Sequence, residues 1–107
     1  MQADNQTLLD NVERTLQLAV DPNLTDAQRK DALIKGTQLR SRLVTLMAAR
    51  FEDGTQKVVD ANAKIKEVNG LLKQNLKDLQ GIVKTLNAVG NLVSIVDDLF
   101  KLPFSFV

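Results

Sequence analysis

The sequence has 107 residues, of which 44% are apolar, 25% are charged and only 4% are aromatic, and its formal net charge is +1. Cysteine, histidine, tryptophan and tyrosine are absent, which excludes disulfides, thiolate metal sites and the most common general base. The near-zero net charge removes any general attraction to nucleic acid or acidic membranes. Length and composition predict one globular domain over residues 1–107.

The first predicted helix runs near residues 5–20. Asp4 and Asn5 are good N-cap residues, and the sequence from Asp21 to Asn23 ends the helix because its proline lacks an N–H. One helical face is expected to be apolar. Its members are Leu9, Val12, Leu16, Ala19 and Val20.

The second predicted helix runs near residues 25–52. Thr25 and Gln28 have the spacing of a capping box, in which side chain and backbone satisfy each other's free groups. Gly54 suits the left-handed turn that follows the helix. The expected apolar stripe consists of Ala32, Gly36, Leu39, Leu43, Leu46 and Met47.

Apolar residues recur every seven positions through the second half of the chain. One row consists of Val58, Ile65, Leu72, Leu79, Leu86, Val93 and Phe100, and the other of Ala61, Val68, Asn75, Ile82, Val89 and Val96. Two such rows predict helices packed along a long seam. Asn75, the polar member, either fixes the register of the seam or faces a helix end without a special role.

A single helix over residues 56–102 would be about 70 Å long, much longer than the other two. A break is therefore expected at Gly90-Asn91, giving helices near 56–88 and 91–102, with Asn69-Gly70 and Gly81 as other candidates. The predicted fold is an all-α, antiparallel up-down bundle of four helices. The alternative is three helices with one long C-terminal helix. Residues 103–107 are expected to form a short extended tail.

The sequence contains no constellation that predicts catalysis, a cofactor or a metal site. Neighbouring acids at Asp97-Asp98 point about 100° apart on a helix, so they form a poor acid–base pair. A row of lysines at Lys66, Lys73, Lys77 and Lys84 would lie on one face of a continuous helix. This row is a candidate for binding an anionic surface, and the alternative is a solvated outer face.

The C-terminal segment is the best candidate for binding a partner. Its candidate anchors are Leu99, Phe100, Leu102, Phe104, Phe106 and Val107. Aromatic and aliphatic residues at the end of a chain can fill a partner's groove. The alternative interpretation is that the segment completes the core and fastens the bundle.

These patterns favour a non-enzymatic protein that acts through protein–protein interaction, either with another protein or with a second copy. The alternative is a peripheral membrane protein that uses residues 91–107 and the lysine row. Neither specific nucleic-acid binding nor a small-molecule ligand is indicated. The polar start at Gln2 lacks an apolar signal region, so a cytoplasmic chain and a secreted or periplasmic mature chain are equally compatible.

Overall fold

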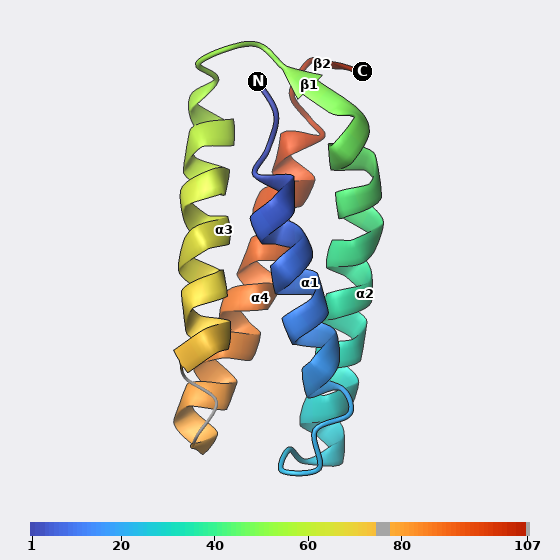
Figure 1. Ribbon diagram of the computed structural model, residues 1–107, viewed down its shortest axis with the longest axis vertical. Coiled ribbons are helices and arrows are strands. Elements are labelled where there is room, and N and C mark those ends of the chain that lie inside the picture. Colours follow the sequence, from blue (N-terminus) through green and yellow to red (C-terminus); the bar gives the residue numbers. More distant parts are fainter. Residues whose placement is uncertain (75–77, 107) are drawn as a thin grey trace.

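The computed structural model describes residues 1–74 and 78–106. They form four helices, α1 (Asn5–Leu18), α2 (Asp26–Ala48), α3 (Gln56–Gln74) and α4 (Leu79–Leu99), and two short strands, β1 (Ala49–Phe51) and β2 (Phe104–Phe106). The helices pack side by side in a bundle of 42 × 20 × 19 Å (Figure 1). The predicted all-α four-helix bundle is confirmed, and the three-helix alternative is wrong. Asn75, Lys77 and Val107 lie outside the described residues.

Each helix runs antiparallel to the next along the chain, but spatial neighbours follow a different order (Figure 1). Helix α1 packs against α2 and α3, and α4 packs against α3 and α2. The pairs α1–α3 and α2–α4 are therefore parallel neighbours, while α2 and α3 lie diagonally across the bundle. The connection from α2 to α3 must cross the end of the bundle.

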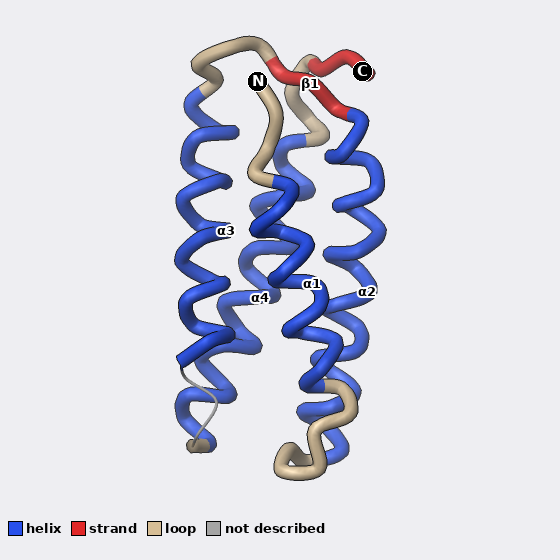
Figure 2. The backbone as a smooth tube through the Cα atoms, viewed as in Figure 1, coloured by secondary structure: helices blue, strands red, loops and turns tan. Residues whose placement is uncertain are grey.

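Strand β1 lies in this crossing connection and pairs antiparallel with β2, with Ala49 opposite Phe106 and Phe51 opposite Phe104 (Figure 2). The Phe51 N–H donates to the Met1 carbonyl oxygen at 2.7 Å. The predicted helix end at residue 52 is wrong, because α2 stops at Ala48 and the backbone groups that follow bond to β2 and Met1 instead. The tail, expected to be extended, forms β2.

Local capping signals place the helix starts. The Gln28 N–H donates to the Thr25 hydroxyl at 3.1 Å, and the Gln28 side chain accepts from the Thr25 N–H at 2.9 Å. This confirms the capping box. Asp4 accepts from the Thr7 N–H at the start of α1. Gly54 has φ 77°, the left-handed conformation expected of it.

The predicted break at Gly90-Asn91 is wrong, because both residues lie inside α4. The second half divides earlier, between the end of α3 at Gln74 and the N-cap of α4. Asp78 is that N-cap, and its carboxylate accepts from the Gly81 N–H at 2.7 Å. The Lys35 side chain of α2 lies over Gly90, where a Cβ would stand 3.0 Å from Cε of Lys35.

The heptad rows form the core of α3 and α4, with Val58, Ile65, Val89 and Val96 fully buried. Leu79 departs from its row, because it starts a new helix at the end of the bundle and is 64% exposed. The stripe predicted for α2 is buried from Ala32 to Leu46, but Met47 is exposed.

The apolar face predicted for α1 is correct for Val12, which is buried, and for Leu16 and Ala19, which are partly buried against the core, but it is wrong for Leu9 and Val20. The buried residues are Leu8, Asn11, Val12, Thr15 and Leu18, whereas Leu9 and Val20 are exposed. Two polar residues therefore replace apolar ones on the inner face of α1. The Asn11 side-chain amide donates to the Ile65 carbonyl oxygen at 3.0 Å in the interior.

Polar cross-links join the two parallel helix pairs. Between α1 and α3, Asn62 accepts from the Asp4 N–H at 2.7 Å, in addition to the buried Asn11 contact. Between α2 and α4, the Arg42 guanidinium binds the Asp97 carboxylate, with Nε and Oδ1 2.8 Å apart. This hydrogen bond raises the pKa of Arg42 above its usual value. Directional contacts of this kind fix register, which apolar packing alone leaves less defined.

Among the described helices, α4 is long and apolar enough in composition to cross a membrane, with a mean hydropathy of 1.2 over its most apolar 18 residues. Core helices of bundles also have these properties, and the inner face of α4 packs against α2 and α3.

Candidate functional site

The C-terminal candidates lie mainly inside the bundle end. Leu99 is buried, while Phe100, Leu102 and Phe104 are half-buried against the core. The Phe104 ring stands 5.6 Å from Phe51 and 6.1 Å from Phe100, measured between ring centroids. Such tilted contacts stabilise a packed aromatic cluster. Of the described candidates, Phe106 is the largely exposed one.

The lysine row does not lie on one helix. Lys66 and Lys73 are exposed on α3, whereas Lys84 lies on α4, which runs in the opposite direction. A single face requires one continuous helix through these lysines, so the predicted face is wrong for these three residues.

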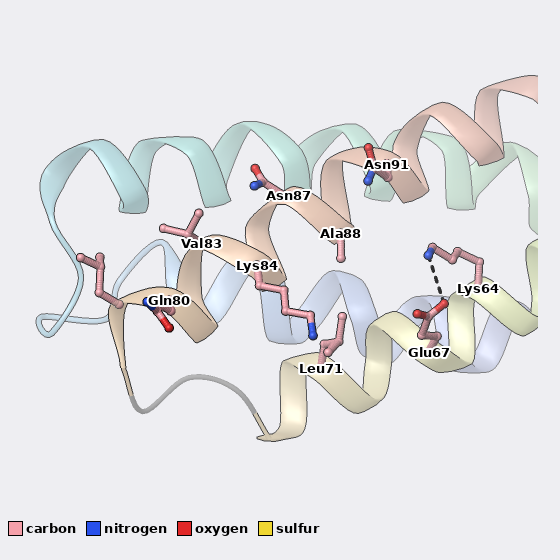
Figure 3. A pocket seen from close by; sticks show the side chains of 10 residues that line it. Lys64, Glu67, Leu71, Gln80, Val83, Lys84, Asn87, Ala88 and Asn91 are labelled. Carbon is pink, nitrogen blue, oxygen red and sulfur yellow. Dashed lines mark ion pairs between the residues drawn. The ribbon is translucent and has the colours of Figure 1, made fainter.

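A groove runs between α3 and α4 and encloses about 650 Å³. Its lining residues are Lys64, Glu67 and Leu71 of α3, and Leu79, Gln80, Val83, Lys84, Asn87, Ala88 and Asn91 of α4 (Figure 3). Leu79 and Val83 are 64% and 45% exposed, and they lie one helical turn apart on α4. The groove therefore combines apolar walls with amide and charged groups.

Charge is distributed unevenly along this groove. The Lys64 ammonium and Glu67 carboxylate form an ion pair of 3.1 Å, and they lie toward the Asn91 end (Figure 3). Lys84 points from α4 toward Leu71 of α3, and it makes no ion pair within the described residues. The Asn91 end thus holds a carboxylate paired with a lysine, whereas Lys84 lies nearer the Leu79 end without an ion pair among the described residues.

A second hollow of about 330 Å³ continues the same groove toward the C-terminal end of α4. Ile95 and Leu99 supply its apolar lining, and Lys57, Asp60, Lys64 and Asp98 surround it. The α3–α4 surface thus has a protruding apolar residue, Leu79, at one end and an apolar hollow at the other.

Three further acids form ion pairs away from the α3–α4 groove or at its edge. Asp97 binds Arg42, Asp98 binds Lys101 at 3.1 Å, and Asp10 binds Arg14 at 2.8 Å. The Arg14 hydrogen bond lowers the pKa of Asp10 below its usual range. Within residues 1–74 and 78–106, no group of three or more acids is arranged to hold a metal ion.

Sequence reasoning missed the groove because it placed Leu79 in the core. The useful signal was Asp78, a strong N-cap residue directly before Leu79. A helix that begins there places Leu79 in the first turn, at the bundle's end. No family model matches the chain, and no match was found among curated proteins or solved structures.

Proposed function

We propose that this chain is a non-enzymatic interaction protein that pairs with a second copy of itself through the α3–α4 groove. The observation that carries the proposal is the arrangement of the α3–α4 surface: exposed Leu79 lies at one end and the hollow lined by Ile95 and Leu99 at the other, with Lys84 and Glu67 between them. Its exposed apolar residue, its apolar hollow, its free lysine and its carboxylate are placed so that two copies can match them. Isologous contacts of this kind are the usual basis of symmetric dimers.

The apolar match follows from a twofold axis that crosses α4 at Asn87. Such an axis runs the two α4 helices antiparallel. A residue that lies a given number of positions before Asn87 in one copy then meets the residue that lies the same number of positions after Asn87 in the other. Leu79 of one copy then meets Ile95 of the other, where the 330 Å³ hollow can receive it. Val83 meets Asn91 of the second copy. Burial of Leu79 removes the most exposed apolar side chain of the groove from water.

The charge match follows from the same axis. It places Lys84 of one copy level with Gly90 of the other, beside the Asn91 end of the groove where Glu67 lies. Glu67 is 61% exposed despite its contact with Lys64, so it can accept a second cation. Each dimer contains this Lys84–Glu67 contact twice, and the α4 surface carries no other charge near Asn87.

Charge-reversal variants test this symmetry directly. Lys84→Glu alone places two like-charged contacts in the dimer, and Glu67→Lys alone does the same. We expect each variant to dimerise about tenfold more weakly than the natural sequence, because attraction becomes repulsion at two sites. An equal mixture of the two variants restores both opposite-charge contacts and is expected to dimerise with near-natural affinity. Sedimentation equilibrium measures all three samples.

Arg50→Glu is the matched control, because Arg50 is exposed on β1 away from the groove. It is expected to dimerise as the natural sequence does. Circular dichroism checks that every variant remains helical. Equal dimerisation of both single variants and the natural sequence, or a mixture no tighter than the single variants, would reject the proposed interface.

Membrane association is the second candidate, and the observation that favours it is the apolar composition of α4. Under the self-pairing proposal, the apolar residues of α4 are covered by the bundle and the second copy. We therefore expect less than about a tenth of the protein to sediment with liposomes of neutral or anionic lipid. Sedimentation that rises steeply with anionic lipid content would favour the membrane account instead.

A further inference from the structure

Asn69 and Gly70 on α3 form a dipeptide that is prone to a spontaneous reaction. Asn69 is the only asparagine of the sequence that is followed by glycine. A glycine has no side chain to shield its backbone nitrogen, and its backbone rotates more freely than that of other residues. This nitrogen can therefore attack the side-chain amide carbon of the preceding asparagine.

The reaction has two balanced steps. In the first, a bond forms between the Gly70 nitrogen and Cγ of Asn69, and the bond from Cγ to the side-chain nitrogen breaks. That nitrogen leaves as ammonia with the proton of the Gly70 N–H, and a cyclic imide remains. In the second, one water molecule opens the imide at either of its carbonyl carbons, which gives aspartate or isoaspartate at position 69. Water is the only co-reactant, so the reaction needs no enzyme.

The fold of α3 blocks the first step. Both residues lie inside this helix, which continues to Gln74. In an α-helix the N–H of residue 70 donates to the carbonyl oxygen four residues earlier, which holds the attacking nitrogen away from the side chain of residue 69. Asn69 is also held against the bundle and is only 8% exposed. The attack therefore requires α3 to open around residue 69.

The packing of the bundle does not require glycine at position 70. A Cβ on Gly70 would have no atom within 4 Å, and the glycine with a positive φ among the described residues is Gly54. Glycine inside a helix nevertheless lowers helix stability relative to alanine. Gly70 thus favours the opening of α3 and also permits the reaction in the opened helix.

Asn69 faces α1, where either product would disturb the contact between the two helices. The pKa of Asp10 on α1 is lowered by its hydrogen bond to Arg14 and by one that it accepts from the Asn69 side chain. One helical turn earlier, Asn11 of α1 donates to the Ile65 carbonyl oxygen at 3.0 Å. Aspartate at position 69 would replace a donor to Asp10 by a second negative charge at a nearly buried site. Isoaspartate would also add a CH2 group to the backbone and interrupt the helix.

We propose that Asn69 is a modification site controlled by the opening of α3: it loses its amide in molecules whose α3 has separated from α1 at this point, and the product prevents the two helices from closing again. A transient opening is thereby converted into a permanent one, and the converted fraction increases with the age of the protein. The inference concerns a single chain and does not rest on pairing through the α3–α4 groove.

The conversion rates of folded and unfolded protein test the control by opening. Both samples are incubated at the same mildly alkaline pH, one of them in guanidinium chloride, and mass spectrometry of the tryptic peptide 67–73 measures the converted fraction. We expect Asn69 to convert at least about a hundredfold more slowly in the folded protein, because only the open fraction of molecules reacts. Gly70→Ala is expected to slow conversion of the unfolded protein at least about tenfold, because the methyl group shields the attacking nitrogen.

Val68→Ala tests whether the opening of α3 at this point sets the rate. Val68 is fully buried next to Asn69, so its truncation weakens the packing of this part of α3. We expect conversion of the folded protein to accelerate at least about fivefold, with no change in guanidinium chloride. Val59→Ala is the matched control, because it makes the same change on the same helix at a position that is 43% exposed. Its rate is expected to stay within about twofold of that of the natural sequence.

Asn69→Asp reproduces one product and tests its effect on the bundle. This variant is expected to unfold at a lower guanidinium chloride concentration than the natural sequence, because its new carboxylate lies beside Asp10. The inference is overturned by equal conversion rates in folded and unfolded protein, by equal acceleration in Val68→Ala and Val59→Ala, or by an unfolding midpoint that Asn69→Asp leaves unchanged. None of these results depends on self-pairing, which the charge-reversal mixture tests separately.

Discussion

Replacing Asn11 by aspartate is expected to lower the free energy of unfolding by about 3–5 kcal/mol at pH 7, because it leaves an unpaired charge in the interior. Asn11 has no exposed surface, and its amide donates to the Ile65 carbonyl oxygen at 3.0 Å. A carboxylate has no proton to donate there and would face that carbonyl oxygen. The stability of a domain of this size is about 5–15 kcal/mol in total, so the loss is severe.

The loss should depend on pH in a defined direction. Burial raises the pKa of the new carboxyl above its unfolded value of about 3.9. The full destabilisation is present above the raised pKa, and it shrinks as pH falls through that value and the group becomes neutral. Urea unfolding of both proteins at a series of pH values measures the difference.

Asn11→Leu is the control that separates charge from shape. It removes the amide and also the Asn11 Oδ1 atom, which lacks a hydrogen-bond partner among the described residues. We expect a change within about 1 kcal/mol, because removing an incompletely satisfied polar group offsets the lost hydrogen bond. A stability of Asn11→Asp that equals that of Asn11→Leu at every pH would show that residue 11 is not buried as the structure has it.

The second large effect is expected from Leu39→Ala on α2. Leu39 is fully buried on the side of α2 that faces the core. Deletion of a buried leucine side chain costs about 2–5 kcal/mol through lost burial and the remaining cavity. Leu33→Ala makes the same chemical change on the same helix at a half-exposed position. It is expected to change stability by less than about 0.5 kcal/mol.

Chemical denaturation of the two alanine variants compares them directly. The difference between them tests which side of α2 faces the core, because helix propensity changes by the same amount in both. Similar losses for Leu33→Ala and Leu39→Ala would mean that both sides of α2 are covered within one chain.

The sequence patterns predicted the architecture well where apolar periodicity and caps agreed. Thr25 and Gln28 placed the start of α2, and the rows through Ile65 and Val89 identified the core of α3 and α4. These signals are local, and the physical forces behind them act within a few residues. Predictions from these signals therefore hold without knowledge of the tertiary structure.

The failures share a different cause, which is that contacts between distant segments decided the outcome. Asn11 is buried because a carbonyl oxygen of α3 accepts its amide, and apolar periodicity does not contain that information. Gly90 resembles a helix break, yet it accommodates the Lys35 side chain of a neighbouring helix. The end of α2 depends on pairing with β2, more than 50 residues later in the chain.

The candidate site was harder to predict than the fold. A groove between α3 and α4 exists only because Asp78 starts a new helix and Leu79 is thereby turned outward. The prediction that the lysines share one helical face failed for the same reason, since Lys73 and Lys84 belong to two antiparallel helices. Phe104 was placed by aromatic packing with Phe51, which no spacing within the sequence predicts.

The most direct test of self-pairing is the absolute mass of the natural protein, measured by size-exclusion chromatography with light scattering from about 1 µM to about 1 mM. Pairing through the groove predicts a mass that rises with concentration to twice the chain mass of 11.8 kDa. A mass of one chain throughout that range would contradict pairing through the α3–α4 groove.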